Sequence, residues 1–115
     1  MKNNNDLLNI TKPDVITEIH EAYLTAGADI IETNTFNGTS VSQSDYGLES
    51  WVFELNKQAS ILGRRAADKI STNEWRRYVA GAVGPTNRTA SVSPKVEDPA
   101  FRNVTYTELV TSYKE

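Results

Sequence analysis

The chain has 115 residues, a formal net charge of −3 at pH 7 and a hydrophobic share of 38%. This length allows one small domain, and the charge offers no basic surface of the kind that binds nucleic acid. The absence of cysteine excludes disulfides and thiolate metal ligands within the chain. No apolar run approaches the roughly 20 residues of a membrane span, and the first residues lack the apolar core of a secretory signal. We expect a cytoplasmic domain without nucleic-acid or membrane partners.

The first part of the chain predicts a loop and then a helix. Residues 3–10 are polar and predict a loop. The helix is expected to start with Thr11 as its cap and Pro13 in its first turn. Apolar residues recur at helical spacing as far as Ala26. Gly27 is then placed to end the helix in a left-handed conformation.

A strand with a polar end follows this helix. Ile30 and Ile31 stand side by side, which predicts a parallel strand that is buried on both faces. A carboxylate, an amide and two hydroxyls come next, on Glu32, Thr33, Asn34 and Thr35. Ligands of α/β sheets and barrels bind at the carboxyl ends of the strands. This polar end is therefore the candidate site.

A second unit of the same design comes after a loop. A short helical turn is expected near residues 42–46 and a long amphipathic helix over residues 48–70, whose apolar stripe packs on a sheet. Residues 78–83 predict a second buried strand, and residues 84–88 give it a polar end. Two strands joined by a helix run parallel, so both polar ends are expected at one edge of the sheet.

The rest of the chain predicts an irregular loop over residues 89–104 and then a helix that begins with a capping box at Thr105 and Glu108. The predicted order is helix, strand, helix, strand, loop, helix. Because parallel sheets occur almost only in larger layered folds, this order indicates a slice of a larger α/β fold.

Three segments together resemble a known family. They are Gly-Ala-Asp-Ile-Ile-Glu-Thr-Asn-Thr-Phe (residues 27–36), Gly-Pro-Thr-Asn-Arg-Thr (84–89) and Asp-Pro-Ala-Phe-Arg-Asn (98–103). The chain resembles the homocysteine-binding domain of cobalamin-dependent methionine synthases, within the homocysteine S-methyltransferases. The first segment is similar to that family broadly, and the later two resemble its cobalamin-dependent branch.

This resemblance implies a (β/α)8 TIM barrel, of which the chain would form helix 1, strands 2 and 3 and the start of helix 3. Residues 1–115 would then be an N-terminal fragment of the homocysteine-binding domain, incomplete at both ends. The implied reaction transfers a methyl group from methylcobalamin to zinc-bound homocysteine, giving methionine. Methyltetrahydrofolate re-methylates the cobalt on other domains.

The resemblance also implies which parts of that machinery are absent. The family's zinc ligands are three cysteines on later strands, and this chain has none. We therefore expect no catalytic residue and no metal ligand here, with zinc and cobalamin bound only in the full-length enzyme. The fragment is expected to be inactive alone.

The candidate substrate-binding residues form one wall of a homocysteine pocket. They are Glu32, Asn34, Thr35, Phe36, Thr86 and Asn87. The alternative is that these polar groups only satisfy hydrogen bonds inside the protein. A buried Glu32 with a raised pKa would be a candidate general base, but alkyl transfer to a zinc thiolate needs none in its attacking step. His20, the single histidine, is expected to pack on its helix, and Arg88 is expected to be structural or solvated.

Two other functions remain open from the sequence. One is a homocysteine methyltransferase that uses another methyl donor, such as betaine or S-methylmethionine. The other is a truncated remnant without catalysis.

Overall fold

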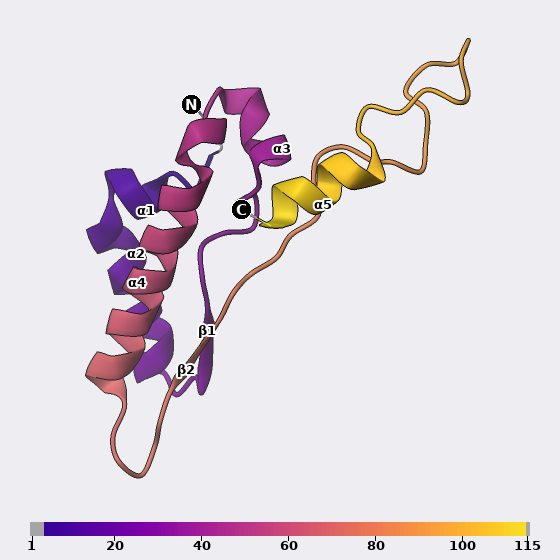
Figure 1. Ribbon diagram of the computed structural model, residues 1–115. Coiled ribbons are helices and arrows are strands. Elements are labelled where there is room, and N and C mark those ends of the chain that lie inside the picture. Colours follow the sequence, from indigo (N-terminus) through magenta and orange to yellow (C-terminus); the bar gives the residue numbers. More distant parts are fainter. Residues whose placement is uncertain (1–3, 115) are drawn as a thin grey trace.

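The structure is a computed structural model that describes residues 4–114, an elongated molecule of 59 × 27 × 21 Å (Figure 1). Its α-helices are α1 (Leu8–Thr11), α2 (Pro13–Thr25), α3 (Ser40–Gln43), α4 (Val52–Ile70) and α5 (Tyr106–Lys114). Its strands are β1 (Ile30–Glu32) and β2 (Tyr78–Ala80), and two 3-10 turns, η1 (Ser44–Tyr46) and η2 (Glu49–Trp51), precede α4. The predicted α/β order is confirmed. The short helical turn expected near residues 42–46 is present as α3 and η1, whereas α1 and η2 were not predicted.

The start of the chain differs from the prediction. Helix α1 replaces part of the expected loop, and Thr11 lies inside it, where its hydroxyl donates to the Leu7 carbonyl at 3.2 Å. Helix α2 starts at Pro13 after Lys12, whose side chain makes no capping bond. Thr11 is therefore not the cap of α2. The reason is tertiary: the buried side chain of Asn9 holds α1 in place by bonds to carbonyls outside it, and helical periodicity does not report such contacts.

The end of α2 follows the prediction for Gly27. This residue has a φ of 111°, a backbone conformation that favours glycine. The Gly27 N–H bonds to the Leu24 carbonyl and the Ala28 N–H to the Tyr23 carbonyl, both at 3.1 Å. This pair of bonds is a Schellman motif, which satisfies the last carbonyls of the helix and turns the chain into β1.

Strands β1 and β2 pair in parallel, with Ile31 opposite Val79. Helices α2 and α4 pack against each other and against this sheet, as the ribbon shows (Figure 1). The core between them contains Leu24, Ile31 and Ala66, with Val79 packed against it. Gly63 on α4 lets Val79 approach, since a Cβ there would stand 3.0 Å from a methyl of Val79.

The prediction that the first strand is buried on both faces is wrong, and the second strand is not buried as expected. Ile31 is 5% exposed, whereas its neighbour Ile30 is 59% exposed and Tyr78 on β2 is 53% exposed. Successive side chains of a strand point to opposite faces, and the helices of the described chain cover one face only. The second strand also ends at Ala80, so Val83, which was expected within it, is 80% exposed.

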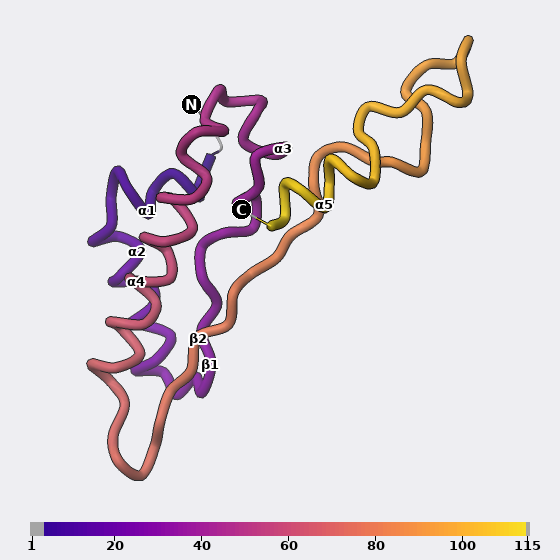
Figure 2. Tube along the Cα trace, viewed as in Figure 1, coloured from indigo at the N-terminus to yellow at the C-terminus, as the bar shows by residue number. Residues whose placement is uncertain are grey.

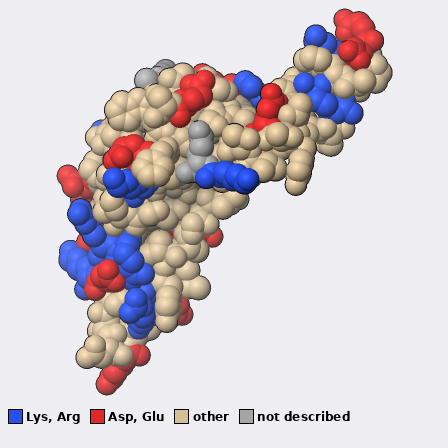
Figure 3. All heavy atoms as spheres, in the orientation of Figure 1, with Lys and Arg blue, Asp and Glu red and all other residues tan. Residues whose placement is uncertain are grey.

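Helix α4 has the predicted amphipathic character, although it begins at Val52 rather than at residue 48. Its apolar stripe is buried against the sheet and α2, at Val52, Leu55, Ala59, Leu62 and Ala66. Lys and Arg side chains gather on the surface over its C-terminal part, with acidic groups among them (Figure 3). Ion pairs join Arg64 to Asp68 at 2.7 Å and Lys69 to Glu21 at 2.8 Å. This outer face is therefore a solvated charged surface.

Residues 89–104 contain neither helix nor strand, as predicted, and form an arm that projects from the body (Figure 2). The chain returns through α5, whose capping box is confirmed. The Thr105 N–H donates to the Glu108 carboxylate at 2.7 Å, and the Glu108 N–H donates to the Thr105 hydroxyl at 3.2 Å. The Tyr113 hydroxyl donates to the Gly84 carbonyl at 2.7 Å, which fastens α5 next to the end of β2. No helix in the described part of the chain is long and apolar enough to cross a bilayer.

Candidate functional site

The polar ends of β1 and β2 lie together, as the parallel pairing predicts. Beyond the ladder, the Thr33 N–H donates to the Ala80 carbonyl at 2.9 Å, and the Ala82 N–H donates to the Thr33 hydroxyl at 3.0 Å. The Thr35 hydroxyl donates to the Ala82 carbonyl at 2.8 Å and lies 2.7 Å from the Thr33 hydroxyl. Both threonines are buried. Their hydroxyls thus extend the strand pairing where backbone pairing stops.

Gly84 brings the two polar ends into direct contact. A Cβ built on Gly84 would stand only 2.1 Å from the carbonyl oxygen of Phe36. Only a residue without a side chain permits this approach of backbone to backbone. The Phe36 side chain itself is 57% exposed, so it lies at the surface where the two ends meet.

Asn34 and Glu32 differ in their surroundings. The Asn34 amide donates to the Asn5 carbonyl at 2.8 Å, and the Asn34 carbonyl accepts from the Asn9 side chain at 2.7 Å. Asn34 therefore ties the end of β1 to the N-terminal segment. Glu32 is exposed, so the hypothesis that it is a buried base is wrong: its side chain lies on the sheet face that no helix of the described chain covers.

A buried polar network supports this region, and the sequence analysis did not predict it. The Asp6 carboxylate accepts from the Asn37 N–H at 2.6 Å, and the Gln43 amide donates to the Asn37 carbonyl at 2.9 Å. The Asn4 amide donates to the Gln43 side chain at 2.8 Å. Asp6 and Gln43 are almost fully buried, at 2% and 0% exposure. The sequence does carry one hint of this network: four of the six residues 4–9 have amide or carboxyl side chains.

Burial raises the pKa of the Asp6 carboxyl above its ordinary value of 3.8, while the hydrogen bond from Asn37 opposes that rise. A raised pKa in the folded state contributes stability that is complete below 3.8 and is lost as the pH rises through the folded-state pKa. Asp6→Asn removes this loss and keeps an oxygen that can accept from Asn37. Its free energy of unfolding is therefore expected to improve relative to the unsubstituted chain as the pH rises from about 4 to about 7.

Urea unfolding at several pH values measures this difference. Asp14→Asn serves as the control, because it removes the same charge at an exposed position of α2. A difference between Asp6→Asn and the unsubstituted chain that stays constant over this pH range would contradict the prediction.

Thr86 and Asn87 lie beyond Gly84 and bond locally. The Thr86 hydroxyl donates to the Arg88 carbonyl at 2.6 Å, and the Asn87 amide donates to the Asp45 carboxylate. Arg88 lies 3.6 Å from the same carboxylate. This segment is therefore attached to η1, and Arg88 has the structural role that was expected. The structure brings Thr35 and Phe36 close to the segment that contains Gly84. It joins Asn34 to the N-terminal segment and directs the hydrogen bonds of Thr86 and Asn87 elsewhere.

The residues present do not fit a zinc ion. Within residues 4–114 no three His, Cys, Asp or Glu side chains are grouped so that they could hold a metal. The single histidine, His20, is 6% exposed, and burial lowers the pKa of its imidazole. Zinc sites need about three or four such ligands, so no step of a reaction is derived from zinc bound to this chain.

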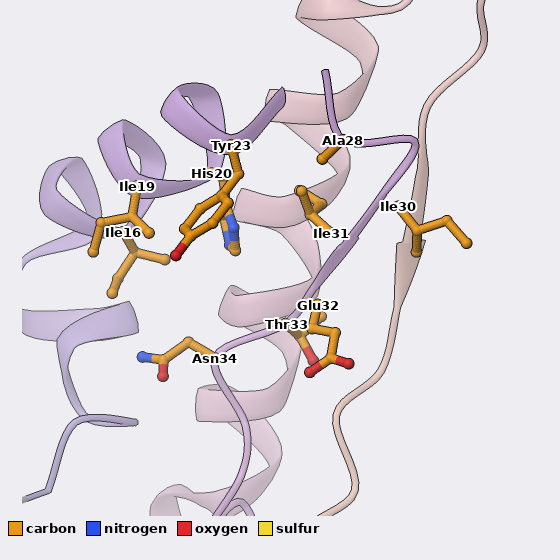
Figure 4. A pocket seen from close by; sticks show the side chains of 10 residues that line it. All are labelled: Ile16, Ile19, His20, Tyr23, Ala28, Ile30, Ile31, Glu32, Thr33 and Asn34. Atoms are coloured by element: carbon orange, nitrogen blue, oxygen red, sulfur yellow. The ribbon is translucent and has the colours of Figure 1, made fainter. Parts of the chain in front are cut away.

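A groove of about 440 Å³ lies between α2 and β1 (Figure 4). Apolar side chains of α2 form one wall, and β1 with its polar end forms the other. The groove follows the edge of β1 that faces away from β2. It is separate from the contact between Phe36 and Gly84.

Comparisons with known proteins show which family this chain is similar to. The chain is similar to the homocysteine methyltransferase MmuM from Escherichia coli, whose crystal structure is of the metallated form, with a TM-score of 0.64 and 25% sequence identity. The match covers 74% of this chain and 32% of that protein, so the chain spans about a third of its relative. The family model of homocysteine S-methyltransferases matches residues 2–115. The chain therefore belongs to the homocysteine S-methyltransferase family.

Proposed function

We propose that the chain is part of a cobalamin-dependent methionine synthase, which transfers a methyl group from methylcobalamin to homocysteine and so forms methionine. Family membership over residues 2–115 supports homocysteine as the methyl acceptor. The segments 84–89 and 98–103 support the cobalamin-dependent branch, because their motifs resemble that branch. The location of such an enzyme would be the cytoplasm.

The proposed architecture is a (β/α)8 barrel in which β1 and β2 are strands 2 and 3. Helices α2, α4 and α5 would then be its first three helices, and residues 1–115 an N-terminal fragment of the homocysteine-binding domain. The parallel pairing of β1 and β2, with α2 and α4 on one face, supports this assignment. In such barrels the carboxyl ends of the strands carry the active site.

The observation that carries the proposal is the contact between the two polar strand ends at Phe36 and Gly84. It supports a shared pocket wall, because ligands of barrels bind at the carboxyl ends of the strands. Glu32, Phe36 and Asn87 are the exposed members of the proposed pocket wall. Thr35 would keep that wall in shape through its buried hydroxyl. Asn34 and Thr86 complete the proposed set.

In this proposal, the groups that carry out methyl transfer belong to parts of the enzyme outside this chain. Zinc, cobalamin and methyltetrahydrofolate would be bound there, and this chain alone would not catalyse methyl transfer. Its contribution would be one wall of the homocysteine pocket, held by the polar network around Asp6 and Gln43.

The test is to capture from source cells the polypeptide that carries this sequence and to assay methionine formation from homocysteine. Methylcobalamin, betaine and S-methylmethionine are supplied in separate reactions. Methionine from methylcobalamin is the expected result. Methionine only from betaine or S-methylmethionine would overturn the cobalamin assignment, and no methionine from any donor would identify a non-catalytic remnant.

In the same polypeptide, Asn34→Ala is expected to raise the KM for homocysteine about tenfold and to change kcat less, since a pocket wall contributes mainly uniform binding. Steady-state kinetics with varied homocysteine measures this effect. Asn73→Ala is the matched control, because Asn73 is an exposed loop residue between α4 and β2. Equal KM values for the two variants would show that Asn34 does not shape the pocket.

A further inference from the structure

Asn37 and Gly38 form the one Asn-Gly step of the sequence. They lie in the loop between β1 and α3, directly after Phe36. Asparagine is among the thermolabile residues. Its side-chain amide is lost most readily when glycine follows, because no side chain then hinders the nitrogen that attacks it. Asn37 is only partly buried, so water reaches it. A chemically reactive step therefore lies beside the contact between Phe36 and Gly84.

The reaction at such a step needs a free nitrogen on the following residue. The Gly38 nitrogen loses its proton and attacks Cγ of Asn37, so that an N–Cγ bond forms, the Cγ–Nδ2 bond breaks and ammonia leaves with the proton. The product is a cyclic imide. Water then opens the ring at either carbonyl and gives aspartate or isoaspartate, without oxidation or reduction. The rate therefore depends on whether the Gly38 nitrogen and Cγ of Asn37 are free to approach each other.

The fold holds the peptide groups of Gly38 on both sides. The Gly38 N–H donates to the Thr35 carbonyl at 3.0 Å, and the Gly38 carbonyl accepts from the Asn56 amide at 2.8 Å. A Cβ at Gly38 would stand 2.7 Å from Oδ1 of Asn56 and 3.0 Å from the Thr35 carbonyl oxygen. The packing thus requires glycine here, and the same packing engages the nitrogen that would attack Asn37.

The main-chain groups of Asn37 are held as well. Its N–H donates to the buried Asp6 carboxylate at 2.6 Å, and its carbonyl accepts from the buried Gln43 amide at 2.9 Å. Attack by the Gly38 nitrogen requires the backbone of Asn37 to rotate, and this rotation would break bonds to buried partners, which is costly. All four main-chain polar groups of the Asn-Gly step are therefore bonded in the fold.

We propose that Asn37 is a deamidation site that the folded chain keeps unreactive, and that opening of the polar network around Asp6 and Gln43 releases it. Aspartate at position 37 adds a carboxylate to the residue whose N–H binds Asp6. Isoaspartate also lengthens the main chain, which shifts the N–H and the carbonyl of residue 37 relative to each other. Either product disturbs the loop that begins at Phe36, and neither returns to asparagine. This inference does not depend on the proposed function.

The experiment incubates the full chain at a mildly alkaline pH, folded or unfolded in guanidinium chloride, and follows loss of the Asn37 amide by peptide mapping with mass spectrometry. Deamidation of Asn37 is expected to be about tenfold or more faster in the unfolded chain, because all four main-chain groups are then free. Equal rates in the two conditions would overturn the proposal.

Asn73 is the internal control in the same samples. It is exposed in the loop between α4 and β2, and the N–H of the following Glu74 makes no hydrogen bond within residues 4–114. Its rate is therefore expected to differ much less between the folded and the unfolded chain. An equal change of rate at Asn37 and Asn73 would attribute the effect to the solvent and would overturn the proposal.

Gln43→Ala tests the role of the network, because it removes the donor to the Asn37 carbonyl. It is expected to speed deamidation of Asn37 in the folded chain about fivefold or more. Gln58→Ala is the matched control, since Gln58 is a partly exposed residue of α4 that bonds to Glu54 on its own helix. Circular dichroism checks that both variants are folded. A folded Gln43→Ala variant with an unchanged rate would overturn the proposal.

A second measurement on the unsubstituted chain serves if Gln43→Ala does not fold. NMR follows amide exchange of Gly38 over a series of guanidinium chloride concentrations up to the unfolding transition, and peptide mapping follows Asn37 in the same series. Exchange of this N–H and its attack on Asn37 both require the bond to the Thr35 carbonyl to break, so the two rates are expected to rise in parallel. Deamidation that stays constant while exchange at Gly38 rises would contradict the proposal.

Discussion

Gly84→Ala is expected to lower the free energy of unfolding by about 3 kcal/mol, at the upper end of the cost of overpacking. The added methyl group would lie 2.1 Å from the Phe36 carbonyl oxygen, and it would also contact the Phe36 ring. The closest atom belongs to the backbone, so it cannot move aside as the far end of a flexible side chain could. The two polar strand ends must therefore separate for the variant to fold.

Gly81→Ala is the matched control for this experiment. Gly81 is on the same segment, three residues earlier, and a Cβ there would meet nothing within 4 Å. The control is expected to be neutral, or slightly stabilising because alanine restricts the unfolded chain. Urea unfolding of both variants measures the difference, and amide NMR of residues 33–37 reports whether the strand ends separate. Equal unfolding midpoints would show that the contact at Gly84 is not tight.

This contact also connects stability to the proposed function. If the two strand ends form one wall of a homocysteine pocket, Gly84→Ala in the complete enzyme moves Phe36 relative to Thr86 and Asn87. Catalytic geometry tolerates such shifts poorly, since a displacement of about 1 Å can cost about 100-fold in rate. The same substitution therefore tests the fold in this chain and the pocket in the enzyme.

The features that the sequence predicted are those with local signals. The capping box at Thr105 and Glu108 and the glycine stop at Gly27 depend on neighbours within a few residues, and both are present. The convergence of the two polar ends also follows from local evidence, because a helix between two strands implies parallel pairing.

The features that the sequence did not predict depend on distant partners. Helix α1 exists because Asn9 bonds to the Asn34 carbonyl, 25 residues away. The one-sided burial of β1 depends on which faces the helices cover, and the adjacent Ile30 and Ile31 carry no information about that. Similarly, the role of Thr35 in joining β1 to the segment after β2 appears only when Ala82 is located.

Arg77 is a further residue of this kind, and its substitution is the second large effect. Arg77→Met is expected to lower the free energy of unfolding by about 2–3 kcal/mol, the range for a hydrogen bond to a charged group. The Arg77 guanidinium is buried and donates to the Leu24 carbonyl at 2.7 Å and to the Ala28 carbonyl at 2.8 Å. It also lies 3.4 Å from the centre of the Trp75 ring.

The expected loss combines two opposing terms. Methionine fills much of the same volume and removes the cost of burying a charge, which offsets part of the damage. It leaves the carbonyl of Leu24, in the last turn of α2, and the carbonyl of Ala28, just before β1, without their cationic donor. The positive charge of Arg77 also interacts favourably with the negative end of the α2 dipole, and the variant loses this interaction. The balance favours destabilisation because Arg77 makes both bonds from one nitrogen in a buried position.

Two further variants separate these terms. Arg77→Lys keeps the charge but has no planar guanidinium to stack on Trp75, so an intermediate loss is expected. Arg76→Met removes the same charge from the exposed neighbouring residue and is expected to cost less than about 0.5 kcal/mol. Urea unfolding of the three variants at one pH measures the order. If Arg76→Met and Arg77→Met lose the same stability, the bonds to Leu24 and Ala28 do not hold the end of α2, and the position of β1 must depend on the apolar core alone.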